Sequence, residues 1–289
     1  MRRTCAITGA GGYVGSCIAR ELASAGWEIR ALSHSAPSAR QSQLTEMRFE
    51  LAREPSPQLL EGVDALVHAA YDFSPTRWSD IRQVNVEGSR RLFAAARRAA
   101  VGRIVLLSTV AAYPGARSKY GRAKLEIERA AVEAGAAIVR PGLVWGPRGA
   151  SILGALQRAV EHLPLVPLLV PPELELSAVH EDDLAALVER LLASWPEGSG
   201  KLLVAASGAT LTFGELLRRL ALRAGRRPRL VRFPWRLAWL GLRALELVGA
   251  APFRSDSLLS LATADGDPFA RATDWPDRYG VRFRPYPAA

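Results

Sequence analysis

The chain has 289 residues, a net charge of +10, and a composition that is 49% hydrophobic and 23% charged. This length suits one large α/β unit, or one domain with a smaller appendage, and the composition excludes a disordered chain. The basic residues are scattered and form no run interleaved with aromatic residues, so a nucleic-acid-binding surface is not expected. Nearly all of them are arginines, which suit small anionic ligands.

Two cysteines, Cys5 and Cys17, are too few for a disulfide framework and are not spaced as metal ligands. They favour a reducing compartment, so a cytoplasmic location is expected. The start of the chain, MRRTCAITGAGG, is interrupted by glycines and is not typical of a signal peptide. The most apolar helical stretch, 235–251, contains three charged residues and is too short for a membrane span. The expected partner is therefore a small molecule.

The first two thirds of the chain alternate short apolar runs with amphipathic segments. The apolar runs predict strands, several of them buried on both faces, at 4–8, 28–32, 47–50, 65–69, 103–108 and 137–140. Helices are predicted between them at 13–25, 78–100 and 119–134. This alternation predicts an α/β fold with a doubly wound parallel sheet.

The character of the chain changes after Pro147. Residues 163–172 are rich in proline and leucine and predict an extended loop. A helix at 181–193, a strand at 201–205, helices at 212–224 and 235–247, and an irregular tail follow. We predict a dinucleotide-binding domain over 1–162, to which 177–206 return. Residues 163–289 are mainly a small, interleaved C-terminal lobe that binds the substrate.

A glycine-rich segment, TGAGGYVG, follows the first strand and opens the first helix. Its key glycines are Gly9, Gly12 and Gly15. The first permits a tight turn, the second lets the backbone approach a pyrophosphate, and the third lets helix and strand pack closely. The helix N-terminus then offers unpaired N–H groups to the phosphates. The flanking strand and helix give the pattern its specificity for a dinucleotide.

The end of the second strand bears on which dinucleotide binds. A site for NAD usually has an acidic residue there, which binds the ribose 2′-hydroxyl. This chain has Ser33 and His34 instead, and Arg40 follows a few residues later. These three side chains are suited to a 2′-phosphate, so NADP is favoured over NAD. Arg40 has the alternative interpretation of an exposed loop charge.

Tyr120 and Lys124 are four residues apart in a predicted helix, so both lie on one face. An ammonium near a phenol favours the phenolate, and Lys124 is expected to lower the pKa of Tyr120 from its usual value of about 10. A tyrosine tuned in this way can exchange a proton with a carbonyl oxygen as hydride is transferred. The pair therefore predicts an acid/base function.

Seven short motifs occur in a characteristic order. They are TGAGGYVG (8–15), HAA (68–70), NVEGSRRL (85–92), LSTVAAY (107–113), YGRAK (120–124), RPGLVWGP (140–147) and VHEDDLA (179–185). With them, nearly the whole chain resembles an extended short-chain dehydrogenase/reductase of the epimerase/dehydratase superfamily. The resemblance implies a Rossmann-like fold, an NAD(P) cofactor, and the homodimer that relatives often form.

The resemblance also implies roles for individual residues. Tyr120 would be the acid/base, and Lys124 would bind the nicotinamide ribose and lower the pKa of the tyrosine. Thr109, or the adjacent Ser108, would hydrogen-bond the substrate carbonyl. Asn85 would help to hold the lysine or a proton-relay water. The further residues expected against the cofactor are Tyr13, Val14, Ala69, Ala70 and Pro141.

Several other residues have two interpretations. The acids of His180-Glu181-Asp182-Asp183 invite a metal site, but contiguous acids cannot face one point on a helix. We expect them to cap the 181–193 helix and to favour its dipole, with no metal bound. His68 is expected to pack near the cofactor. Tyr71 and Asp72 either line the substrate site or form a loop turn. Tryptophans that either wall a substrate pocket or belong to the core are Trp145, Trp235 and Trp239.

Three functions remain open at this level. One is a reductase or dehydrogenase that acts on a small or apolar carbonyl or alcohol; the second is a nucleotide-sugar epimerase or dehydratase with tightly bound NAD. The third is a non-catalytic cofactor-binding scaffold, against which the intact Tyr120–Lys124 pair argues. Nucleotide-sugar members of the family carry an asparagine where this chain has Leu143. An apolar residue cannot contact the phosphates, so an NADP-dependent reductase is favoured.

Overall fold

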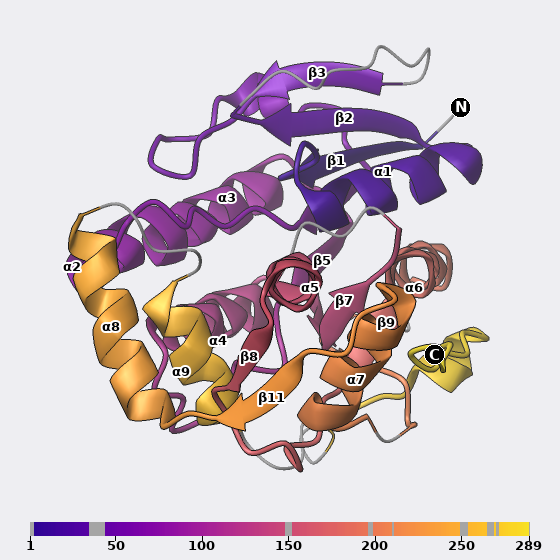
Figure 1. Ribbon diagram of the computed structural model, residues 1–289. Coiled ribbons are helices and arrows are strands. Elements are labelled where there is room, and N and C mark those ends of the chain that lie inside the picture. Colours follow the sequence, from indigo (N-terminus) through magenta and orange to yellow (C-terminus); the bar gives the residue numbers. More distant parts are fainter. Residues whose placement is uncertain are drawn as a thin grey trace.

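The computed structural model describes residues 3–34, 44–147, 152–195, 199–209, 211–248, 254–264, 269 and 272–288, and its ribbon is drawn in Figure 1. Its central layer is a seven-stranded sheet in the order β10-β6-β5-β4-β1-β2-β3, in which every pair of neighbours is parallel. The strands are β1 (Thr4–Thr8), β2 (Glu28–Ser33), β3 (Leu44–Arg48), β4 (Ala65–His68), β5 (Arg103–Leu107), β6 (Ala137–Pro141) and β10 (Leu202–Ala205). The predicted doubly wound parallel sheet is confirmed.

Helices cover both faces of this sheet (Figure 1). One face carries α1 (Tyr13–Ser24) and α6 (Glu181–Ala193), which pack against each other. The other face carries α3 (Glu87–Arg98) and α4 (Lys119–Glu133). Successive strand residues alternate between the two cores: Ile7 packs with the α1–α6 side, whereas Ala6 packs with the α3–α4 side. This burial on both faces explains why the strands read as continuous apolar runs.

A second group of elements forms a lobe with its own apolar core. Two short parallel pairs join β7 (Leu143–Trp145) to β9 (Ala178–His180) and β8 (Leu165–Leu168) to β11 (Arg229–Arg232). The helices of the lobe are α5 (Ile152–His162), α7 (Phe213–Arg223), α8 (Trp235–Leu247) and α9 (Ser255–Ala262). Helix α9 contacts both α8 and α4, so the lobe reaches the main domain at α4 (Figure 1).

The structure corrects several predicted elements. The third strand is Leu44–Arg48 and not 47–50. The predicted loop 163–172 contains β8, which pairs with β11 more than 60 residues later along the chain. The tail contains α9, and the predicted helix 78–100 is divided into α2 (Trp78–Ile81), a π-helical turn (Arg82–Val86) and α3. The domain boundaries stay predictions, although β10 lies in the main sheet as expected for 177–206.

None of the helices in the described part of the chain combines the length and apolar character that crossing a membrane requires.

Candidate active site

A large cavity lies at the carboxyl ends of the sheet strands and extends into the lobe, with a volume of about 1670 Å³. The strand order reverses between β1 and β4, and ligands of doubly wound sheets bind at such a switch point. The predicted residues that line the cavity are Gly9, Gly12, Tyr13, Val14, Gly15, Ser33, His34, Ala69, Ala70, Ser108, Thr109, Tyr120, Lys124 and Pro141. Asn85 lies outside this lining, and Arg40 lies outside the described residues.

The glycine loop has no room for side chains. Gly9 has φ +71°, and a Cβ there would lie 2.9 Å from the backbone nitrogen of Ala70. A Cβ on Gly15 would lie 2.2 Å from the carbonyl oxygen of Gly9. The loop therefore holds α1 directly against the end of β1, with the first N–H groups of the helix beside the cavity. Such a cradle fits the pyrophosphate of a dinucleotide.

Ser33 and His34 line the cavity at the end of β2, where a ribose would lie. Arg48 is the register partner of Ser33 on β3, and its side chain forms an ion pair with Glu50. Glu50 also lines the cavity and pairs with Arg53. The sequence analysis missed Glu50 because no motif marks the residues after a third strand.

Tyr120 is the second residue of α4, whose N-cap is Ser118. The Thr109 side chain lies beside the Tyr120 phenol and favours its charged form, so both groups can address one carbonyl oxygen. Burial raises the pKa of Tyr120 to about 12, and the Thr109 side chain opposes this shift. The pKa below 10 that was expected for Tyr120 is therefore not found, because desolvation of the phenolate outweighs the favourable contacts. A neutral phenol at physiological pH is suited to donate a proton.

Lys124 lies one turn along α4 and is buried. Its ammonium donates a hydrogen bond to the Leu107 carbonyl oxygen at 2.8 Å and lies 5.4 Å from the centre of the Tyr71 ring. Burial lowers the pKa of Lys124 to about 8, and the Glu128 carboxylate acts in the opposite direction. The lysine therefore stays mostly charged at neutral pH, and a modest rise in pH neutralises it.

Ser108, the second candidate for the carbonyl-binding hydroxyl, has another partner. Its Oγ donates to the Glu128 carboxylate, which also forms a two-point ion pair with Arg140 at 2.8 and 2.6 Å. All three side chains are buried. This network joins α4 to β5 and β6 beneath Lys124, so the geometry favours Thr109 over Ser108 as the substrate-binding hydroxyl.

Asn85 lies in the π-helical turn and holds the loop that follows β4. Its side-chain amide accepts a hydrogen bond from the Asp72 nitrogen at 2.7 Å and donates one to the Asp72 oxygen at 2.9 Å. The hydrogen bonds of its side chain thus reach Asp72 rather than Lys124, and its expected role in a proton relay stays a prediction. Tyr71 and Asp72 both line the cavity.

His68 is fully buried at the end of β4 between two hydroxyl groups. Its Nδ1 lies 2.7 Å from Thr8 Oγ1, and its Nε2 lies 2.8 Å from Ser89 Oγ. Ser89 donates its proton to the Asn85 carbonyl, so it accepts from Nε2–H, and Thr8 donates to Nδ1. Burial lowers the pKa of His68 to about 3, with a further contribution from the Lys124 charge. His68 is thus a neutral structural link beside the cofactor cradle.

Aromatic rings surround Tyr120. Tyr71 meets it edge-on at a centroid distance of 4.9 Å, and Phe73 stacks on it at 5.6 Å. Phe73 is 54% exposed and lies in the cavity lining, so it covers the phenol from the solvent side. The sequence analysis missed Phe73 because a single aromatic residue in a loop carries no pattern.

The lobe also contacts the start of α4. Asp256, the second residue of α9, accepts hydrogen bonds from the backbone nitrogens of Lys119 and Tyr120 at 2.8 and 2.9 Å. Arg254 donates to the Pro75 oxygen in the neighbouring loop at 3.2 Å. Asp256 and Arg254 both line the cavity. A carboxylate at a helix N-terminus satisfies unpaired N–H groups and the helix dipole, so Asp256 fixes the start of α4.

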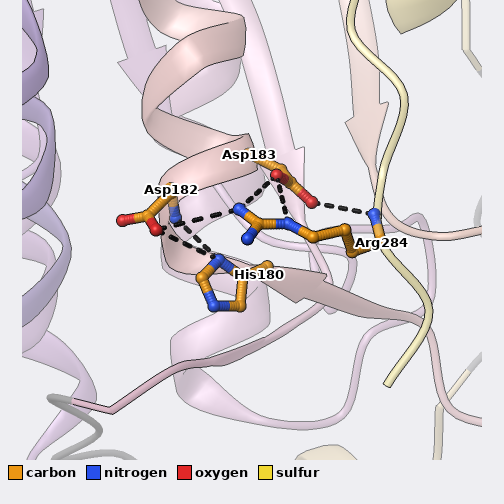
Figure 2. Close-up of polar contacts among 4 residues, drawn as sticks. All are labelled: His180, Asp182, Asp183 and Arg284. Carbon is orange, nitrogen blue, oxygen red and sulfur yellow. Dashed lines mark hydrogen bonds and ion pairs between the residues drawn. The ribbon is translucent and has the colours of Figure 1, made fainter. Parts of the chain in front are cut away.

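The His180 segment is occupied by internal contacts, which Figure 2 shows. The His180 ring accepts a hydrogen bond from the Asp182 nitrogen and caps α6. Asp183 accepts from the backbone nitrogen and Nε of Arg284, both at 2.8 Å, and Asp182 forms an ion pair with the same arginine. The acids therefore fasten the C-terminal segment to α6. Within the described residues, no group of His, Cys, Asp and Glu side chains could hold a metal ion.

The tryptophans do not wall the main cavity. Trp145 packs edge-on against His180 and Tyr286 and borders a smaller cavity of about 340 Å³. Trp235 and Trp239 pack against the core of the lobe. Their large apolar rings contribute to the packing between the lobe helices.

Comparisons with known proteins agree with this geometry. Residues 5–198 match the model of the NAD dependent epimerase/dehydratase family. A ceramide reductase from Caulobacter vibrioides is 31% identical over 240 residues, which cover 81% of this chain and 74% of the relative. Among solved structures, gox2253 has a TM-score of 0.72 at 22% identity, with 98% of this chain and 94% of that chain covered. MoeE5 in complex with UDP-glucose and NAD has a TM-score of 0.70 at 22% identity, with coverages of 80% and 85%.

Proposed function

Because the chain belongs to the NAD-dependent epimerase/dehydratase family of extended short-chain dehydrogenases/reductases, we propose that it is an NADP-dependent reductase of apolar carbonyl compounds. The substrate would be a ketone or aldehyde on an aliphatic, lipid-like molecule, or the corresponding alcohol in the reverse direction. The observation that carries this proposal is the Thr109–Tyr120 pair at one end of a cavity whose lobe side is leucine-rich.

The lobe side of the cavity supports the choice of substrate class. Its apolar lining residues are Leu143, Leu174, Leu176, Leu211 and Leu261. Leu143 stands where nucleotide-sugar members of the family have an asparagine, and it offers no hydrogen bond to a phosphate. An aliphatic chain gains free energy when it leaves water for such a surface. The likeness to a ceramide reductase supports the same class.

The cofactor, when bound, supplies hydride to the carbonyl carbon or accepts it from the alcohol. Thr109 would hold the carbonyl oxygen, and Tyr120 would donate its phenolic proton to that oxygen as its negative charge develops. Lys124 would stabilise the resulting phenolate by its positive charge. Phe73 would exclude water from the phenol. The glycine cradle at Gly9–Gly15 would hold the pyrophosphate.

The preference for NADP rests on the end of β2. Ser33 and His34 line the cavity there, and the chain has no carboxylate in that turn. Both side chains can hydrogen-bond a 2′-phosphate, whereas an acid would repel it. Arg48 on the adjacent strand adds a positive charge near this edge, which Glu50 partly offsets through their ion pair.

The test has two parts. First, the nucleotide released from denatured protein is identified, and its exchange with added NADPH and NADH is measured. Second, NADPH oxidation is followed with aliphatic ketones and aldehydes of increasing chain length. We expect a readily exchanged cofactor and a KM that falls with chain length. A tightly held NAD that does not exchange would overturn the proposal in favour of redox-neutral nucleotide-sugar chemistry.

Tyr120→Phe is the decisive variant. It removes the transferable proton and retains the ring, so turnover should fall about a hundredfold or more while the Kd for NADPH is unchanged. Tyr113→Phe is the matched control, because Tyr113 donates its hydroxyl proton to the Thr263 carbonyl and lies outside the cavity lining. Near-normal turnover of Tyr120→Phe would contradict the mechanism.

A further inference from the structure

Helix α8 exposes an apolar stripe along its length. Leu237, Leu240, Leu245 and Val248, which follows the helix directly, are 57%, 56%, 41% and 74% exposed. Their spacing of three to five residues places them along one side of the helix. An exposed apolar patch of this kind marks an interaction site more often than it marks ordinary surface.

The opposite side of α8 already has its packing partners. Leu242 is buried, and Trp235, Ala238 and Trp239 pack against the core of the lobe. One apolar face of α8 therefore packs on the lobe, and a second apolar face is exposed to solvent. A helix that is apolar on both sides is normally covered on both sides.

Arginines border the exposed stripe. Arg236 and Arg243 are exposed, and each guanidinium lies 5.6 Å from the centre of a tryptophan ring, that of Trp235 and that of Trp239 respectively. The expectation that the basic residues are scattered does not hold for this segment, because residues 223–248 contain seven arginines and a single carboxylate. That carboxylate, Glu246, accepts hydrogen bonds from the backbone nitrogen and hydroxyl of Ser255. The segment therefore attracts negative charge.

Helix α8 is separated from the candidate active site by a single helix. In Figure 1, α8 is at the periphery, and α9 lies between it and α4. Contacts join α8 to α9 and α9 to α4, and Ser257 and Ser260 on α9 line the cavity. A surface that engages the α8 stripe would therefore be one helix away from the cavity.

We propose that the exposed face of α8 docks on the surface of an anionic lipid bilayer. Its leucines would enter the boundary between headgroups and acyl chains, while Arg236 and Arg243 would pair with anionic headgroups. A helix with an exposed leucine stripe bordered by arginines has the composition that binds in this way. A second copy of the chain fits less well, because a symmetric contact would bring the arginines of both copies together. The proposal stands apart from the proposed reaction, since docking requires no catalysis.

The test is co-sedimentation with vesicles. The intact protein is mixed with vesicles of phosphatidylcholine alone, or with vesicles of phosphatidylcholine and phosphatidylglycerol, at low and high salt. We expect binding to the anionic vesicles that weakens as salt increases, because the arginine contacts are screened.

Two double variants test the two parts of the surface. Leu237→Gln with Leu240→Gln should lower the partition coefficient about tenfold or more, because the apolar contact is lost. Arg236→Gln with Arg243→Gln should abolish the preference for anionic vesicles. Val132→Gln with Arg129→Gln is the matched control, since Val132 is 57% exposed and both residues lie on the outer surface of α4. Circular dichroism confirms that each variant is folded.

The outcomes separate the possible partners. Weaker vesicle binding by the leucine variant and loss of the preference for anionic vesicles by the arginine variant, with the control unchanged, support the proposal. Absence of binding to anionic vesicles would overturn it, and so would equal binding by all variants. A concentration-dependent dimer that the leucine variant abolishes, without vesicle binding, would assign the face to a second copy of the chain.

Discussion

The buried histidine beside the cofactor cradle predicts a specific loss of stability in acid. Because His68 has a pKa of about 3 in the folded chain and 6.5 as its ordinary value, the unfolded chain binds a proton that the folded chain excludes. The unfolded state is therefore favoured progressively as the pH falls from 6.5 toward 3. The stability that His68 contributes is fully present above pH 6.5.

The size of the effect follows from the two pKa values. Each pH unit below 6.5 lowers the free energy of unfolding by about 1.4 kcal/mol. At pH 5, His68 should therefore lower the free energy of unfolding by about 2 kcal/mol. This loss is a large part of the free energy of unfolding of a typical protein, which is roughly 5–15 kcal/mol. The physical cause is the position of the ring between the Thr8 and Ser89 hydroxyls, which leaves no solvent for an imidazolium.

Urea unfolding at pH 7, 6 and 5 measures this contribution. His68→Gln can still hydrogen-bond but does not titrate, so the free-energy loss between pH 7 and pH 5 should be about 2 kcal/mol smaller in the variant. His162→Gln is the matched control, because His162 is exposed on α5 and should leave the pH dependence unchanged. Parallel pH dependences for His68→Gln and the unaltered protein would refute the argument, whatever the variant's stability at pH 7.

Three further predictions concern the candidate active site. The pKa of Lys124 is about 8, so the ammonium loses its proton above that pH. We therefore expect kcat/KM for reduction to fall about tenfold per pH unit above pH 8, and we expect Lys124→Arg to move this fall to higher pH. Asp256→Ala removes the two hydrogen bonds to the start of α4. We expect kcat in steady-state assays to fall about tenfold while the Kd for NADPH, measured by titration, stays the same. A change in both quantities would indicate a general structural role for Asp256. Ser33→Asp should lower the preference for NADPH over NADH about tenfold or more, measured as the ratio of the two kcat/KM values. An unchanged ratio would mean that the 2′-phosphate binds away from Ser33.

Local patterns were sufficient to predict the main domain and most of its site. The glycine spacing in 8–15 predicts a turn and a cradle because only glycine fits where a Cβ would meet backbone at 2.2 Å. The four-residue spacing of Tyr120 and Lys124 predicts a shared helix face because the helical repeat fixes it. The strands were visible as apolar runs because both of their faces are buried. These features depend on residues that are near one another in the chain.

The elements that were missed depend on distant partners. The strand β8 forms because β11 lies beside it. Its residues alternate between exposed and buried, but all four are apolar, so the sequence does not show the alternation. Helix α9 and its contact with Tyr120 join residues 136 positions apart. No motif in the sequence connects them.

The chemical state of the site was decided by the tertiary structure. The sequence by itself determined that a tyrosine, a lysine and a hydroxyl residue meet at the end of a parallel sheet. The fold then paired Ser108 with Glu128, placed Thr109 on the Tyr120 phenol, and buried the phenol so that its pKa rises to about 12. These outcomes depend on which groups lose contact with water, and water is excluded by side chains from the whole chain rather than by near neighbours in the sequence.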